Sequence, residues 1–60
     1  MMKIEFTTTS AAFMPDNGGS KEYEITRILQ KIIDDVENGV EHGPIMDLNG
    51  NKIGQWVIEE

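Results

Sequence analysis

Six aliphatic residues in the middle of the chain recur at helical spacing, and this pattern constrains the fold more than any other feature. They are Ile25, Ile28, Leu29, Ile32, Ile33 and Val36. Intervals of three and four residues place all six on one stripe of a helix. Ser20 suits the N-cap, and Asn38-Gly39 suits the end, because glycine adopts the left-handed C′ conformation without steric cost. The sequence therefore predicts a helix over residues 20–38 with one face to bury.

The segments on either side of this helix have the features of strands. "KIEFTTT" alternates apolar and polar residues and predicts a strand over 3–9, followed by a loop over 10–19 rich in Pro, Asp, Asn and Gly. "PIMDLNGNKIGQWVIEE" contains two apolar runs around Asn49-Gly50, which predicts a hairpin over 44–58 with strands at 44–48 and 52–58. Its turn is either the two residues Asn49-Gly50 or a three-residue loop that Asp47 opens, with Gly50 in a bulge.

This order of elements predicts a single small α+β domain over residues 1–60. The chain runs strand–helix–strand–strand, and we expect one helix packed on a three-stranded sheet. The sheet is wholly antiparallel if the third strand lies between the other two. We favour that order.

The small size of the chain suggests self-association. Sixty residues without a cysteine provide a small core and no disulfide to reinforce it. Strict alternation in the last strand points Ile53 and Val57 one way and Trp56 and Ile58 the other. A lone helix covers only one face of a sheet, so we predict a homo-oligomer, with a dimer as the first expectation.

The charge of the chain restricts its partners. Five basic and eleven acidic residues give a net charge of −6, which makes nucleic acid a poor partner and a basic host protein a better one. Lys3 and Glu5 interrupt any signal-peptide apolar region, and no apolar run reaches membrane-spanning length. We therefore expect a cytoplasmic protein that does not enter the membrane.

The stretch "DNGGS" before the helix is the one candidate for a small-molecule site. Backbone amides of a glycine-rich turn can converge on an anion at a helix N-terminus, and Lys21 adds a full charge. The spacing matches neither a P-loop nor a dinucleotide fingerprint, so a turn with Ser20 as cap is the favoured interpretation. The alternative is an anionic, nucleotide-like ligand bound by Phe13, Asp16, Asn17, Gly18, Gly19, Ser20 and Lys21.

Two further features are candidates for binding a protein. The outer face of the predicted helix is charged, with residues Glu24, Arg27, Lys31, Asp34 and Asp35, and with Glu37 and Glu41 just beyond. Its carboxylates gather at the C-terminal end, where the helix dipole disfavours them, so Asp34, Asp35 and Glu37 form either an acidic docking patch or a solvated, salt-bridged face. Trp56, beside Gly54, is typical of a core or an interface, with Gly54 allowing a neighbouring backbone to approach closely.

The sequence offers no constellation for catalysis or metal binding. "DLNGN" begins like a calcium-binding EF-hand loop, but Lys52 and Ile58 occupy positions where that loop needs glycine and a carboxylate. His42 is the sole histidine, and no serine lies in a nucleophile motif. We therefore expect a protein that is not an enzyme and uses no cofactor or metal.

Three stretches carry a family resemblance: "AAFMPDN" in the loop, "ITRILQKIIDDVENG" in the helix and "GPIMDLNGNKIGQW" in the hairpin. Together they resemble small uncharacterised proteins encoded by phages and prophages. The resemblance implies an accessory role in a mobile element and nothing catalytic. It also singles out Phe13, Asp16 and Asn17 as the positions that match the loop motif of that group.

Overall fold

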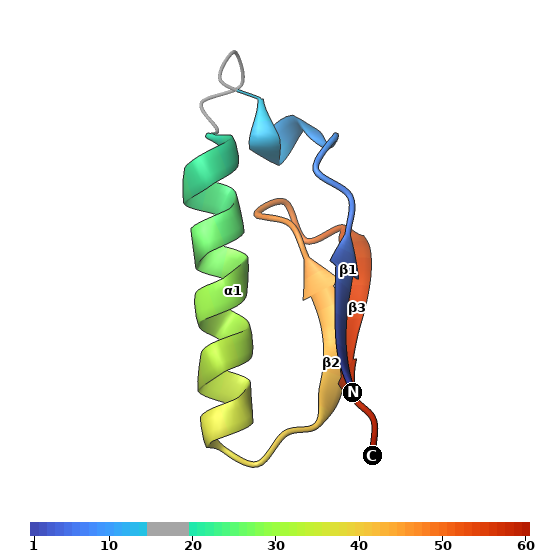
Figure 1. The fold of residues 1–60 in the computed structure, drawn as a ribbon. Helices are drawn as coiled ribbons and strands as arrows, with labels where there is room; N and C mark the ends of the chain where they lie inside the picture. The colour runs from blue at the N-terminus through green and yellow to red at the C-terminus, as the bar shows by residue number, and fades with distance from the viewer. Residues whose placement is uncertain (15–19) are drawn as a thin grey trace.

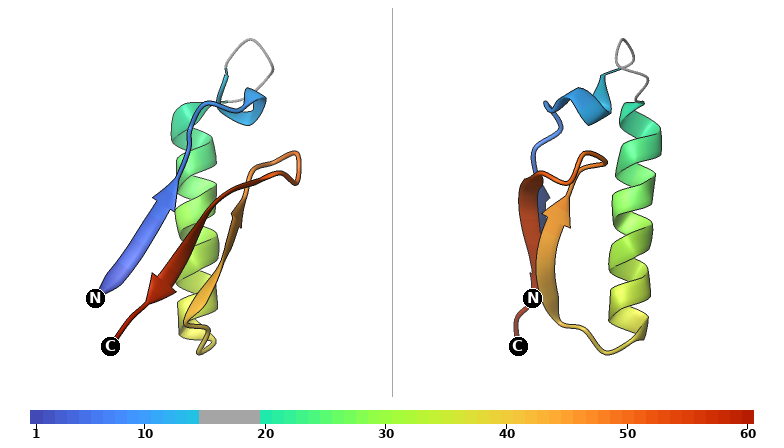
Figure 2. Two further views of the ribbon diagram at one scale, coloured as in Figure 1. Left: turned by 90° about the vertical axis from the view of Figure 1, so that its right-hand side faces the viewer. Right: turned by 180° about the vertical axis from the view of Figure 1, so that it is seen from behind.

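The computed structural model describes residues 1–14 and 20–60. Its elements, in chain order, are β1 (Met2–Phe6), the 3₁₀ helix η1 (Ala11–Phe13), α1 (Lys21–Glu37), β2 (His42–Met46) and β3 (Lys52–Ile58). The strands form one sheet in the order β1-β3-β2, with both neighbouring pairs antiparallel (Figure 1). Helix α1 lies along one face of this sheet (Figure 2). The predicted α+β fold, strand–helix–strand–strand with an antiparallel sheet, is confirmed.

Helix α1 begins and ends at the residues that its sequence predicts as caps. Ser20 has an extended backbone, and its hydroxyl oxygen accepts the N–H of Tyr23 at 3.4 Å. At the other end Gly39 takes a φ of +84°, and its N–H donates to the carbonyl of Val36 at 3.0 Å. The N–H of Val40 then reaches the carbonyl of Asp35 at 2.9 Å, which completes a Schellman motif.

The hairpin uses the three-residue loop, the second of the two alternatives. Asp47 N–H donates to Asn51 O at 2.9 Å, and Gly50, at φ +84°, donates to Asp47 O at 3.0 Å. The Asp47 carboxylate also accepts the backbone N–H groups of Asn49 and Asn51, each at 2.9 Å. Strand β2 covers His42–Met46 and not 44–48, because this loop already occupies Asp47 and Leu48.

Strand β1 is shorter than the predicted strand over 3–9. Thr7 still donates its N–H to Ile53 O at 3.0 Å. In an antiparallel pair, the residues after Thr7 would have to pair with Lys52 and the residues before it. Because β3 begins at Lys52, the ladder between β1 and β3 ends next to Thr7. The predicted loop over 10–19 contains the 3₁₀ turn η1, which carries two side chains into the core. Gly54 allows the close approach of β1, since a Cβ at this position would overlap the backbone of Glu5 and Phe6.

The core lies between α1 and the sheet, and its buried apolar residues are Ala12, Phe13, Ile28, Ile32, Ile45 and Trp56. The prediction that Ile53 and Trp56 face opposite sides is wrong. The register changes from Ile45↔Gly54 to Met46↔Lys52, so Ile53 is an extra residue in β3. Such a bulge breaks the strict alternation of side chains, and Ile53 packs against the same core as Trp56.

Candidate protein-interaction surface

Three of the residues proposed to bind an anion, Phe13, Ser20 and Lys21, lie in the described part of the chain and line one open hollow before α1. Phe13 is 2% exposed and belongs to the core, whereas Lys21 is exposed on the first turn of α1. Ser20 is used as the N-cap, as the favoured interpretation predicts. Asp16, Asn17, Gly18 and Gly19 lie outside the described residues. The anion hypothesis therefore stays a prediction.

A carboxylate already stands at the N-terminus of α1. The Ser20 hydroxyl donates to Glu22 Oε2 at 3.2 Å. A hydrogen bond from its own backbone N–H, followed by this hydroxyl, holds the pKa of Glu22 below its ordinary value. The positive end of the helix dipole thus has a negative side chain beside it, as is favourable at this position.

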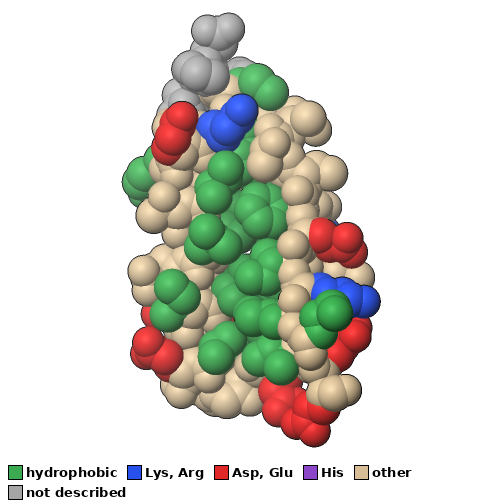
Figure 3. All heavy atoms as spheres, in the orientation of Figure 1, with side chains coloured by type: hydrophobic (Ala, Val, Ile, Leu, Met, Phe, Trp, Pro, Cys, Tyr) green, Lys and Arg blue, Asp and Glu red, His purple; other side chains and the backbone are tan. Residues whose placement is uncertain are grey.

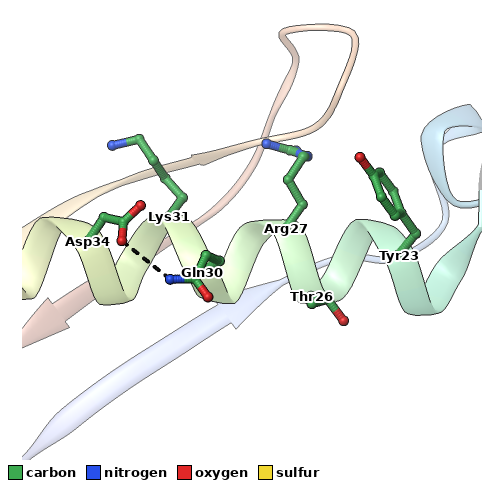
Figure 4. A pocket seen from close by; sticks show the side chains of 6 residues that line it. All are labelled: Tyr23, Thr26, Arg27, Gln30, Lys31 and Asp34. Atoms are coloured by element: carbon green, nitrogen blue, oxygen red, sulfur yellow. Dashed lines mark hydrogen bonds between the residues drawn. The ribbon is translucent and has the colours of Figure 1, made fainter.

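The acidic end of α1 is partly tied to neighbouring side chains. Lys31 Nζ lies 2.6 Å from Asp35 Oδ1, and Gln30 donates to Asp34 Oδ1 at 3.3 Å (Figure 4). Asn38 caps the helix through its side chain, which donates to Asp34 O at 2.7 Å. Asp34 and Glu37 are exposed. The structure therefore shows a salt-bridged outer face that still presents carboxylates to the solvent.

The same outer face carries a shallow hollow, drawn in Figure 4. Its lining residues are Tyr23, Thr26, Arg27, Gln30, Lys31 and Asp34. The side chains stand on one helix and project away from it, and no second element encloses the space between them in that view. A small molecule there would stay largely in contact with water, so this hollow is a poor candidate for a ligand pocket.

Glu24 is a buried charge, so the prediction that it lies on the outer face of the helix is wrong. It is 1% exposed, and its carboxylate pairs with Arg27, whose Nε donates to Glu24 Oε1 at 2.6 Å. Arg27 Nη2 also donates to Met46 O at 3.0 Å, which ties α1 to the end of β2. The signal in the sequence is the spacing, since Glu24 precedes the buried residues Ile28 and Ile32 by four and eight positions.

Arg27 connects one flank of α1 to β2, and the apolar residues on the other flank are exposed to solvent. Leu29, Ile33 and Val36 lie on the flank of the helix opposite Arg27, and they are 40%, 48% and 40% exposed. On β1, Met2 and Ile4 are 45% and 40% exposed. Figure 3, seen from the side of β1, shows hydrophobic side chains gathered in a continuous band along the space between helix and strand. We call these five residues the apolar band.

Trp56, the other residue proposed to bind a protein, lies in the core at 2% exposure. Its indole packs under Gly43 of the neighbouring strand, where an added Cβ would lie 3.2 Å from the ring nitrogen. Its cross-strand neighbour Ile4 is on the same face of the sheet and belongs to the apolar band. The ring is therefore part of the core and is not itself available to a partner.

Other kinds of site find no support in the described ranges, 1–14 and 20–60. These residues contain no cluster of three or more His, Asp or Glu side chains placed to hold a metal ion. Within the same ranges, no helix has the length and apolar character needed to span a membrane. Comparison with protein-family models, curated proteins and solved structures finds no match for this chain.

Proposed function

We propose that this protein is a non-enzymatic accessory protein of phage or prophage type that acts in the cytoplasm by binding protein, as a small homo-oligomer. The observation that carries the proposal is the apolar band. Exposed apolar residues scattered singly are ordinary on a protein surface, but a contiguous band of them is typical of an interaction site.

The position of the band on the fold supports this proposal. Its members come from two elements, α1 and β1, that are distant in the sequence. A partner seated on the band would bury aliphatic groups from both elements at once. Such burial stabilises an association by roughly 25 cal/mol for each Å² of apolar surface removed from water.

The charged residues near the end of α1 indicate which charge a partner would carry next to its apolar contact surface. Asp34 and Glu37 are exposed near the end of α1, beside the salt-bridged Asp35. Of these, Glu37 adjoins the band next to Val36, whereas Asp34 lies on the Arg27 flank, so a host protein docked on the band would match Glu37 with a basic residue of its own. Rim charges of this kind govern specificity and the rate of association more than affinity.

A substitution on the band tests the proposal. Ile33→Glu places a charge in the middle of the band, at a side chain that is 48% exposed and outside the core. Sedimentation should show an oligomer for the wild type and a monomer for this variant, with unchanged circular dichroism. Pull-down from host lysate should lose, with the same variant, any protein that the wild type retains.

The matched control is Leu48→Glu, which changes a 62% exposed apolar residue in the hairpin loop, outside the band. This variant should keep the mass and the partners of the wild type. A wild type that sediments as a monomer and retains no protein would refute the proposed function.

A further inference from the structure

Strand β1 lies at one edge of the sheet, and its outward backbone groups have no hydrogen-bond partner among residues 1–14 and 20–60. Thr7 donates its N–H toward β3, to Ile53 O. Hydrogen-bonded and non-hydrogen-bonded pairs alternate along an antiparallel ladder, so Lys3 and Glu5 also turn their backbone groups toward β3. The outward N–H and C=O groups are those of Met2, Ile4 and Phe6.

The opposite edge of the sheet, on β2, is blocked. Ile58 N–H donates to Glu41 O at 2.7 Å, and the same alternation then points the backbone groups of His42, Pro44 and Met46 outward. Pro44 has no N–H to donate, as is usual on protected edges. Met46 O already accepts Arg27 Nη2. The edge of β1 is therefore the one that can extend the sheet.

The side chains of β1 are complementary to a second, antiparallel copy of the same strand. Lys3 and Glu5 flank Ile4 symmetrically, and both lie on the sheet face opposite Trp56. Pairing centred on Ile4 places each Lys3 opposite Glu5 of the partner subunit. These would be non-hydrogen-bonded pairs, in which Cα atoms approach to about 4.5 Å and side chains are closest.

We propose that two copies of this chain associate through β1, antiparallel and centred on Ile4, to form one continuous sheet with both helices on the same face. This inference rests on the proposed function and names the partner and the geometry of self-association. Ile4 then faces Ile4, and Met2 faces Phe6, with hydrogen bonds between the backbones of each pair. Ile4 and Met2 belong to the apolar band, so the pairing joins the bands of the two subunits.

Charge reversal tests both the strand and its register. Lys3→Glu and Glu5→Lys each create two like-charge pairs in the dimer, and each should raise the dissociation constant about tenfold or more. An equimolar mixture of the two variants should form a heterodimer, because every pair across the junction is then opposite in charge. The double variant Lys3→Glu/Glu5→Lys should dimerise like the wild type.

Two controls separate this effect from other consequences of the changes. Lys21→Glu makes the same change in net charge as Lys3→Glu, but on the first turn of α1 and outside the sheet, and should leave the dissociation constant unaltered. Lys3 also lies 3.6 Å from Glu59 within its own chain. Glu59→Gln removes that pair and should likewise leave dimerisation intact.

Cross-linking gives a second measurement that does not depend on charge. The natural chain has no cysteine. In the proposed pair the two Ile4 Cα atoms lie about 5.5 Å apart, within the range that a disulfide bridges. Oxidised Ile4→Cys should therefore become a covalent dimer much faster than Met2→Cys, whose two copies lie at opposite ends of the paired strands.

The outcomes distinguish this inference from the proposed function. A wild-type oligomer that is insensitive to charge reversal, with no preferential disulfide at Ile4, would overturn the pairing through β1 and leave self-association standing. A monomeric wild type would overturn the pairing through β1, and one that also retains no host protein would overturn the proposed function as well.

Discussion

At the scale of single residues, Asp47 organises the hairpin loop with one buried carboxylate. Its side chain accepts two backbone N–H groups, those of Asn49 and Asn51, and the residue is 4% exposed. The hydrogen bond from the Asn51 N–H is the main reason why the pKa of Asp47 lies below its ordinary value, and it outweighs desolvation.

Replacing Asp47 with Asn should make the stability of the protein less sensitive to acid. Because the pKa of Asp47 is depressed in the folded state, its carboxylate contributes stability above the unfolded-state pKa of 3.8. That contribution is lost as the pH falls below this value through the folded-state pKa. Asn keeps an oxygen acceptor but has no charge to lose. Denaturant titrations from neutral pH to below pH 3.8 should therefore show the wild type and the variant converging, and a constant gap would contradict the assignment.

At the scale of elements, α1 carries two ion pairs that look alike in sequence and differ in burial. Glu24 and Arg27 are three residues apart, with the carboxylate buried and about a third of the Arg27 side chain exposed. Lys31 and Asp35 are four apart, and their side chains are 68% and 26% exposed. An exposed ion pair contributes little to the free energy of unfolding, whereas removing the partner of a buried charge lowers that free energy substantially.

We predict that Arg27→Leu destabilises the protein by about 3 kcal/mol, the low end for removing one partner of a buried pair, because Arg27 is partly exposed. The variant also frees Met46 O at the edge of β2. The double variant Glu24→Leu/Arg27→Leu should recover much of the loss, since no buried charge then remains. Lys31→Ala is the matched control and should cost about 0.5 kcal/mol. Equal losses for Arg27→Leu and Lys31→Ala in urea titrations would show that Glu24 is hydrated.

At the scale of the whole molecule, self-association should couple stability to protein concentration. A partner that binds only the folded chain stabilises it by mass action. For a dimer that dissociates on unfolding, a tenfold rise in concentration contributes about 0.7 kcal/mol per chain, or about 5 °C in Tm for a domain of this size. Scanning calorimetry at several concentrations should show this slope for the wild type and none for Ile33→Glu. A flat wild-type Tm would mean that the folded chain unfolds as a monomer.

Local chemistry in the sequence determined the elements and the ends of α1 and β3. Helical spacing, a serine cap and Asn38-Gly39 predicted α1, because cap hydrogen bonds and a left-handed glycine act within one turn of the chain. Asp47, Asn49 and Gly50 predicted the hairpin for the same reason. The sequence also predicted the antiparallel order with β3 in the middle. In this order β2 pairs with β3, its neighbour in the sequence, and α1 is the only crossover connection that the sheet needs.

Only the tertiary structure decided which faces of these elements are covered. Burial of Glu24 and exposure of Leu29, Ile33 and Val36 depend on the rotation of α1 over the sheet, which Arg27 and Met46 O help to set. The bulge at Ile53 and the shortness of β1 depend on the register between neighbouring strands. The alternation of residues within one strand does not predict that register. The open edge of β1 and the blocked edge of β2 likewise follow from long-range pairing. Spacing along the chain determines local conformation, whereas contacts between distant residues determine which surfaces are left for a partner.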